Sequence, residues 1–175
     1  MECRIIDRAH RADINLANEP FPLFGRMIPA LKNGEWTYTV QLFSEEERSE
    51  MCFPDEDYDF DAMAADHVFV GAYDGEKCVG LAVLKQDMFK YLCLDDLKVC
   101  RAYRRQGVGR MLVEASLAAA REKGCIGLYA VGQDNNLAAC TFYLKNGFEI
   151  GGFDNRVYRG TRQQDKANIL FYRDC

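Results

Sequence analysis

Hydrophobic and polar residues alternate along residues 36–43 (WTYTVQLF), where β-branched and aromatic side chains are frequent. This alternation is typical of a β-strand with one buried face. Apolar runs at residues 68–73, 78–84 and 91–99 predict three more strands, and an Asp-Gly pair at positions 74 and 75 marks a hairpin turn between the first two. The middle of the chain is therefore predicted to be an antiparallel meander.

A helical period replaces the alternation beyond residue 107. Residues 107–123 predict an amphipathic helix that ends at Gly124. Residues 137–145 predict a second helix, stopped by Asn146 and Gly147. The apolar face predicted for the first helix consists of Met111, Leu112, Ala115, Ala118 and Ala119.

The remaining segments predict shorter elements. We expect strands at residues 4–9, 125–131, 148–153 and 169–172, a short helix at 45–51, and loops at 18–26 and 53–61. Strands followed by a βαβαβ order favour a mixed sheet with helices on both faces.

The composition describes one globular domain. The 175 residues are 49% hydrophobic and include no apolar run of the ~20 residues that a membrane span requires. The N-terminal residues lack the apolar stretch of a signal peptide, which predicts a cytoplasmic location. The eight cysteines form no C-x-x-C pair, so we expect reduced thiols and no metal site.

Charge is distributed unevenly along the chain. The net charge of −5 argues against a general nucleic-acid-binding protein. Residues 44–66 contain ten acidic residues against one basic residue, Arg48, so the rest of the chain is net positive. This asymmetry predicts a cationic partner for the acidic segment and an anionic partner for the remainder. A solvated loop is the structural alternative.

Residues 104–109 (RRQGVG) lie between the strand predicted at 91–99 and the helix that follows. A glycine loop in this position directs backbone N–H groups and the positive end of the helix dipole at one point, which favours phosphate. No Gly-Lys-Ser/Thr follows the glycines, and Leu112 stands where a dinucleotide-binding fingerprint has its third glycine. The loop therefore predicts an anion site of another kind, with a helix-capping turn as the structural alternative.

Two motifs together resemble the GCN5-related N-acetyltransferase (GNAT) family. The first is R-x-x-G-x-G at residues 104–109, preceded by the Leu-Lys-Val run at residues 97–99; the second, N-x-x-A-x-x-x-Y-x-x-x-G-F, spans residues 136–148. The resemblance implies an α/β (α+β) fold with a mixed, mostly antiparallel central sheet flanked by helices on both faces. It also implies one domain over residues 1–175, in which residues 1–66 form the substrate side and residues 67–175 the acetyl-CoA-binding core.

Within this family, the chain most resembles streptothricin acetyltransferases, through residues 18–21, 25–26, 36–38, 57–58 and 133–137. The resemblance implies an acetyl-CoA-dependent N-acetyltransferase that inactivates streptothricin, a polycationic antibiotic, and so confers antibiotic resistance. The alternatives are another acceptor (a polyamine, an aminoglycoside-like compound or a protein amine) and a coenzyme A-binding sensor without turnover. The implied partner is a small cationic amine; nucleic acid and membrane are not expected, and a homodimer is left open.

The resemblance implies that backbone groups hold coenzyme A. Backbone groups of the loop would bind its pyrophosphate, and those of Leu97 and Val99 its pantetheine arm. An N–H near Leu97 would polarise the thioester carbonyl, and Asn136 would contact the arm or cap a helix. The expected cofactor-binding residues are Leu97, Lys98, Val99, Arg104, Arg105, Gln106, Gly107, Val108, Gly109, Arg110, Asn136 and Tyr143.

Acetyl transfer to an amine calls for an acid and a base. Tyr143 is the expected acid, because a phenol can protonate the departing thiolate; a core tyrosine is the alternative. Asp95 or Asp96 would take the proton of the attacking ammonium. Adjacent strand residues face opposite sides, so only one of the two is expected to reach the cleft, and we favour Asp95. A carboxylate that only holds the cationic amine is the alternative role.

Aromatic and acidic residues of the N-terminal part are expected to line the cationic substrate, through charge and cation–π contact. They are Trp36, Tyr38, Asp55, Asp57, Tyr58, Asp59 and Asp61. Each has a structural alternative, and Trp36 above all is a candidate core residue.

Overall fold

The computed structural model describes residues 1–87 and 89–175. The chain forms two compact units. The first contains Met1–Glu19, Phe53–Tyr129 and Asp174–Cys175, and the second contains Pro20–Cys52 and Ala130–Arg173. Both units combine strands with helices, which confirms the predicted mixed, mostly antiparallel α+β fold. The first 66 residues are shared between the two units.

Four antiparallel strands form the sheet of the first unit. They follow the order β1 (Glu2–Ile5), β6 (His67–Asp74), β7 (Lys77–Gln86) and β8 (Tyr91–Val99). The meander predicted from the alternating pattern is therefore confirmed. Its first turn passes through Gly75 with φ at +60°, a conformation that glycine adopts without steric cost.

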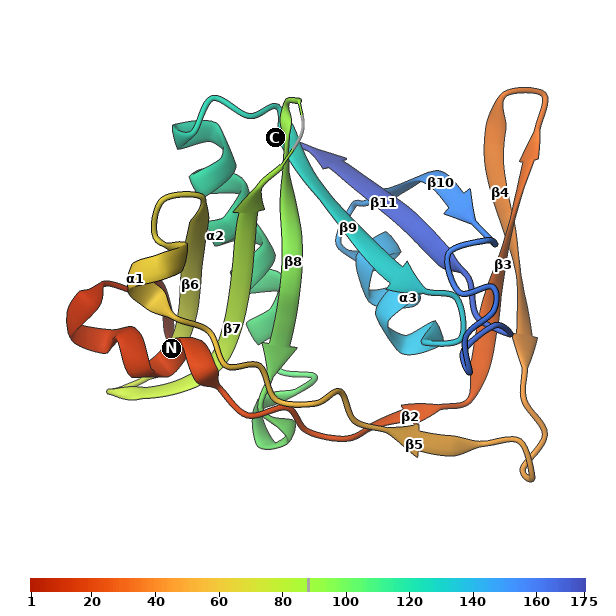
Figure 1. The fold of residues 1–175 in the computed structure, drawn as a ribbon, viewed down its shortest axis with the longest axis horizontal. Helices are drawn as coiled ribbons and strands as arrows, with labels where there is room; N and C mark the ends of the chain where they lie inside the picture. Colours follow the sequence, from red (N-terminus) through yellow and green to blue (C-terminus); the bar gives the residue numbers. More distant parts are fainter. Residues whose placement is uncertain (88) are drawn as a thin grey trace. The chain divides into compact units, whose positions relative to one another are not determined.

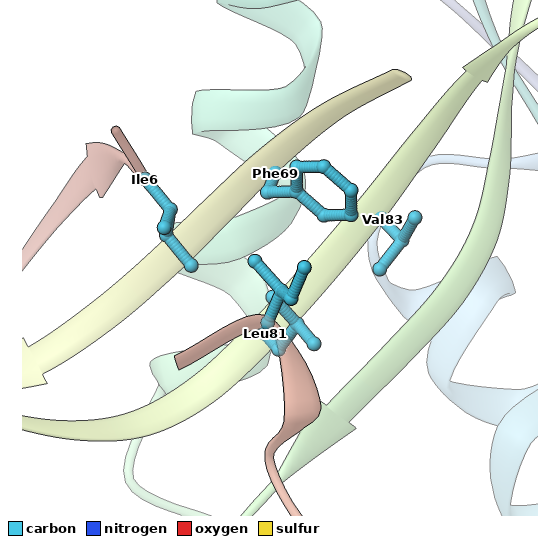
Figure 2. Packing of buried hydrophobic residues seen from close by; sticks show 5 residues of the cluster. Ile6, Phe69, Leu81 and Val83 are labelled. Atoms are coloured by element: carbon cyan, nitrogen blue, oxygen red, sulfur yellow. The ribbon is translucent and has the colours of Figure 1, made fainter. Parts of the chain in front are cut away.

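Helices cover both faces of this sheet (Figure 1). Helix α2 (Val108–Glu122) packs on one face, where the missing side chain of Gly80 lets Leu112 and Val108 approach the strand. The 3₁₀ helix η1 (Arg8–Asn15) and helix α1 (Phe60–Met63) lie on the other. The buried cluster on that second face is shown in Figure 2; it consists of Ile6, Ile14, Phe69, Leu81 and Val83.

The buried face of α2 differs in part from the predicted one. Leu112 and Ala119 are buried as predicted, whereas Ala118 is exposed. The prediction for Ala118 was wrong because Ser116 was left out of the buried face as a polar residue. Ser116 is buried, and its hydroxyl donates to the carbonyl of Leu112 at 2.7 Å. The other buried residues of this helix are Val108, Val113, Leu117 and Ala120.

The second unit is built around helix α3 (Leu137–Lys145) and three strands. Their order is β9 (Gly127–Gln133), β11 (Asn168–Asp174) and β10 (Glu149–Asp154), and the chain passes from the first unit to the second within β9. Two antiparallel pairs complete the unit: β3 (Gly25–Lys32) with β4 (Glu35–Leu42), and β2 (Phe21–Leu23) with β5 (Ser49–Met51).

Several short elements were predicted wrongly. The strand expected at residues 4–9 ends at Ile5, because Asp7 caps η1 by accepting hydrogen bonds from the N–H groups of Ala9 and His10 at 3.0 and 3.1 Å. The helix expected at residues 45–51 is instead a turn followed by β5, and the loop expected at 18–26 contains β2. These two strands pair with each other across 26 or more residues, so no local pattern reveals them.

Among the described residues, no helix is long and apolar enough to cross a membrane. All eight cysteines carry free thiols. Burial raises the pKa of the Cys78 thiol to about 11 and that of Cys140 to about 12, so both remain protonated at neutral pH.

Candidate active site

The glycine loop begins after η2 (Arg101–Tyr103) and ends where α2 starts, at Val108. Arg105 and Gly107 have φ at +66° and +85°, so the backbone turns through the left-handed region twice. Among the described residues other than its two chain neighbours, none has an atom within 4 Å of the place that a Cβ on Gly107 would occupy, which leaves the backbone open to a ligand. The first turn of α2 offers N–H groups without intrahelical partners, so the loop fits a phosphate.

Side chains of the loop anchor it to the strand before it. Arg104 Nε donates to the carbonyl of Val99 at 2.9 Å, and its Nη2 lies 3.5 Å from the Glu19 carboxylate, which also accepts from the N–H of Arg101. Gln106 Nε2 donates to the carbonyl of Ala102 at 2.7 Å. The side chains of Arg104 and Gln106 therefore hold the loop, whereas those of Arg105 and Arg110 are exposed beside it.

Glu19 was not among the expected site residues. It belongs to the stretch at residues 18–21 on which the resemblance partly rests, and that stretch was the only signal that could have identified it. Through its contacts with Arg101 and Arg104, the Glu19 carboxylate helps to hold the start of the loop in place.

A β-bulge separates the two candidate bases on β8. Asp96 lies opposite Val83 of β7, and Leu94 lies opposite Leu84, so Asp95 has no opposing residue. Bulges redirect side chains and are frequent beside active sites. The strict alternation that would send Asp95 and Asp96 to opposite faces is therefore interrupted here. Asp95 is exposed, and the side chain of Asp96 is only 17% exposed.

Three charged side chains meet on the face of the sheet that carries η1 and α1. Lys98 Nζ lies 2.5 Å from Glu56 Oε2 and 2.9 Å from Asp96 Oδ2. The contact to Glu56 has hydrogen-bond geometry. Asp96 Oδ2 is buried, and its contact with Lys98 is an ion pair. We call Glu56, Asp96 and Lys98 the charged triad.

The triad shifts the pKa of each member. Burial raises the pKa of Asp96 above its usual range, although Lys98 opposes the shift. Burial alone would lower the pKa of Lys98 and raise that of Glu56. The contacts between them reverse both shifts, so Lys98 is raised and Glu56, with a further hydrogen bond from Asn18, is lowered. Lys98 and Glu56 therefore both stay charged at neutral pH.

The acidic segment around Glu56 is held in place by two asparagines. Asn18 donates from its backbone N–H to Asp55 Oδ1 at 2.6 Å, and from Nδ2 to Glu56 Oε2 at 2.9 Å. Asn15 binds the backbone of Tyr58. Burial, followed by the negative charges of the triad and Asp95, raises the pKa of Tyr58. Tyr58, Asp95 and Asp96 thus lie close enough to interact, and their contact with a substrate stays a prediction.

Two of the other expected substrate residues have structural contacts. Asp59 caps α1, accepting from the N–H groups of Asp61 and Ala62 at 2.9 and 3.2 Å. Asp61 lies 2.6 Å from Arg8 and 3.6 Å from Arg11. Asp57 is exposed and makes no hydrogen bond or ion pair within residues 1–87 and 89–175. Asp57 is therefore the acid of this segment that remains available to a cation.

Tyr143 and Asn136 belong to the second unit. The Tyr143 ring is 9% exposed and packs against Phe148 and Phe171, with centroids 5.3 and 5.1 Å away. Asn136 caps α3, because its Oδ1 accepts from the N–H of Ala139 at 3.1 Å. The structural role considered for Asn136 is therefore present, and its contact with the cofactor stays a prediction.

Trp36 and Tyr38 project from β4 of the second unit. They line a groove of about 510 Å³ together with Leu144 and Phe148. Tyr38 is 48% exposed and Trp36 is half-buried, so neither is a core residue. Both rings have open surface that a substrate could contact.

Comparison with known proteins identifies the family. Residues 30–148 match the family model described as "Acetyltransferase (GNAT) family". The chain belongs to this family. The acetyltransferase is 35% identical over 161 residues to streptothricin acetyltransferase A of Bacillus subtilis, which covers 91% of this chain and 92% of that protein.

Solved structures support the same conclusion. One, from Bacillus anthracis, is of a protein assigned as a streptothricin acetyltransferase, in complex with acetyl coenzyme A. Its TM-score is 0.87 at 27% identity, and the match covers 99% of this chain and 98% of the other. A nourseothricin acetyltransferase matches with a TM-score of 0.78 at 21% identity over the same shares, which supports the fold alone. The protein is thus an N-acetyltransferase that uses acetyl-CoA.

Proposed function

We propose that this acetyltransferase acetylates an amine of streptothricin. The similarity to streptothricin acetyltransferase A, which extends over nine-tenths of both chains, carries this proposal. The acidic neighbourhood of Asp57, Asp95 and Asp96 supports it, because a polycationic antibiotic suits a site with excess negative charge. A cytoplasmic location fits the eight free thiols and the intracellular supply of acetyl-CoA.

Binding of acetyl-CoA would rest on backbone groups. The N–H groups from Arg104 to Arg110 would hold its pyrophosphate at the open backbone of Gly107. The strand residues Leu97 and Val99 would meet the pantetheine arm through their backbones, and an N–H near Leu97 would polarise the thioester carbonyl. Bound acetyl-CoA supplies the acetyl group to be transferred.

Removal of a proton from the substrate ammonium falls to Asp95. Its carboxylate is exposed at the bulge, whereas Asp96 is mostly buried and engaged with Lys98. We assign Asp95 to take the proton, directly or through one water, so that the neutral amine has a free electron pair for attack. Tyr143 would donate its phenol proton to the departing thiolate sulfur. The amine nitrogen loses its second proton after the attack, and this proton would restore the Tyr143 phenol, while Asp95 would release the first proton to water. The net result is one new N–C bond, one broken S–C bond, one proton on sulfur and one proton released.

The cationic substrate would be held by aromatic rings and carboxylates. Trp36 and Tyr38 offer faces for cation–π contact along the groove of the second unit, and Asp57 and Tyr58 offer charge and an aromatic edge in the first. Asp55, Asp59 and Asp61 would act indirectly, because their carboxylates already bind other groups of the protein.

Incubation of the purified protein with acetyl-CoA and streptothricin tests the proposal, with product followed by mass spectrometry. We expect streptothricin heavier by one acetyl group. Spermidine, an aminoglycoside and a lysine peptide serve as competing acceptors in parallel reactions. Faster turnover of any of them would replace streptothricin as the substrate. No product from any amine, with coenzyme A still bound, would favour a sensor.

A further inference from the structure

The charged triad links two segments that are 42 residues apart in the sequence. Glu56 lies in the irregular acidic segment before α1, and Lys98 and Asp96 lie on β8. Apart from the triad, Asn15 and Asn18 attach this segment to residues near η1. Lys98 therefore connects the acidic segment to the strand carrying both candidate bases, alongside the interaction of Tyr58 with Asp96.

The position of Lys98 on β8 explains why its side chain can do this. Lys98 lies opposite Leu81, and Asp96 lies opposite Val83, so both share the face on which Leu81 and Val83 form the buried cluster. The aliphatic part of Lys98 runs along this apolar surface, and its side chain is only 10% exposed. The ammonium group then has few partners other than the two carboxylates. This role is separate from the backbone contact with the cofactor expected at residues 97–99.

Charge determines what the triad offers to a substrate. Lys98 balances one of the two carboxylates, so the triad retains one net negative charge beside Asp95 and the exposed Asp57. Without Lys98, Glu56 and Asp96 would repel each other, and the repulsion would drive the acidic segment away from β8. A cationic amine would then meet the same acids in the wrong arrangement.

We propose that Lys98 is a positioning residue, whose ammonium holds the acidic segment against β8 and so shapes the amine site. The proposal deepens the function proposed above and rests on it. Acetyl-CoA does not depend on this contact, because its expected partners are backbone groups of the strand and the loop. Loss of the Lys98 side chain should therefore weaken binding of the amine substrate and leave binding of acetyl-CoA unchanged.

Steady-state kinetics of Lys98→Met provide the test. We expect KM for streptothricin to rise about tenfold or more, with KM for acetyl-CoA within about twofold of the unmodified enzyme, because only the amine site loses an ion pair. Lys98→Arg should restore KM for streptothricin to within about threefold, since a guanidinium can bind both carboxylates. Lys85→Met, at an exposed strand position outside the triad, is the matched control and should change neither KM.

A double-mutant cycle with Glu56→Gln tests whether Lys98 acts through Glu56. If the two residues act on each other, the double variant Glu56→Gln/Lys98→Met should be no worse than Lys98→Met alone. Hydrogen exchange supplies a readout that needs no turnover: amides of residues 53–59 should lose protection in Lys98→Met while those of α2 keep theirs.

The outcomes separate this inference from the proposed function. Unchanged KM for streptothricin together with unchanged protection of residues 53–59 would overturn the role of Lys98. Equal losses for both substrates, unrescued by arginine, would reduce it to general stability and also overturn it. An unmodified enzyme that does not acetylate streptothricin would refute the proposed substrate, while the exchange experiment would still decide whether Lys98 holds the segment.

Discussion

Asn15 and Tyr58 bind each other through two hydrogen bonds. Asn15 Oδ1 accepts from the Tyr58 N–H at 2.8 Å, and Asn15 Nδ2 donates to the Tyr58 carbonyl at 3.0 Å. A side-chain amide thus pairs with the backbone as a neighbouring strand would, although 43 residues separate the two positions. The segment before α1 has no regular structure of its own, and this pair fixes its course toward β8.

Asn15→Ala removes both hydrogen bonds at once. We expect the free energy of unfolding to fall by about 1 kcal/mol, because the pair is partly exposed to water. KM for the amine should rise more than KM for acetyl-CoA. Urea denaturation and steady-state kinetics measure the two effects. Asn155→Ala, at an exposed position without hydrogen bonds of its side chain among the described residues, should change stability by less than about 0.5 kcal/mol.

Local signals in the sequence predicted the elements with their own start and stop residues. Helix α3 begins where Asn136 caps it, and α2 ends where Gly124 has φ at +71°. The meander from β6 to β8 also follows from a local pattern. By contrast, β2 and β5 depend on each other, and η1 depends on Asp7, a cap that the strand pattern of residues 4–9 obscured. These elements therefore depend on contacts between distant residues or on a cap, which the local hydrophobic pattern does not reveal.

The candidate site was predictable to a similar extent. The glycine loop was predictable from its residues, because glycine readily adopts the positive φ found at Gly107 and carries no Cβ that would cover the backbone. The acidic run at residues 44–66 indicated a cationic partner, but the sequence did not distinguish Glu56, which binds Lys98, from Asp59, which caps a helix. The different roles of Glu56 and Asp59 depend on which residues of the folded chain lie next to each of them.

Gly107→Ala tests whether the glycine loop binds the phosphates of coenzyme A. No atom would clash with the new Cβ, so the cost to stability is the left-handed φ of +85°, about 1–2 kcal/mol. The same Cβ would stand where a phosphate approaches the backbone, so we expect Kd for coenzyme A to rise about tenfold or more. Calorimetric titration measures the affinity. Gly75→Ala has the same kind of backbone strain and the same empty surroundings. It should lose similar stability and bind coenzyme A normally.

The two aspartates on β8 should respond differently to amidation. Asp95→Asn should lower kcat with streptothricin by about 100-fold, because the expected base is lost. Asp96→Asn should act mainly on KM for the amine, because it removes one partner of Lys98 and leaves Asp95 intact. Kinetics at pH 7 compare them directly. The reverse ranking would make Asp96 the base and Asp95 an accessory charge.

Glu56 links the stability of the protein to pH. Its pKa in the folded state is below the ordinary value of 4.5, because the hydrogen bonds from Lys98 and Asn18 outweigh the effect of burial. A lowered carboxyl pKa stabilises the fold above the unfolded-state pKa, and this contribution is lost as the pH falls through the folded-state pKa. The unmodified protein should therefore exceed Glu56→Gln in stability by up to about 1 kcal/mol at pH 7. In urea titrations the difference should shrink as the pH falls below 4.5 and through the folded-state pKa, and a gap that stays constant on acidification would contradict this linkage.

Tyr143→Phe separates an enzyme from a sensor. The ring is held by Phe148 and Phe171, so the variant should keep its fold and its affinity for coenzyme A. Loss of the phenol proton should lower kcat by about 100-fold, as removal of a general acid does. Rapid-quench measurement of acetylated streptothricin, together with calorimetric titration of coenzyme A, checks both expectations. Tyr91→Phe, which removes the hydrogen bond from the Tyr91 hydroxyl to Asp174, is the control and should retain full turnover. An active Tyr143→Phe variant would assign the acid to another group and leave Tyr143 as a core residue.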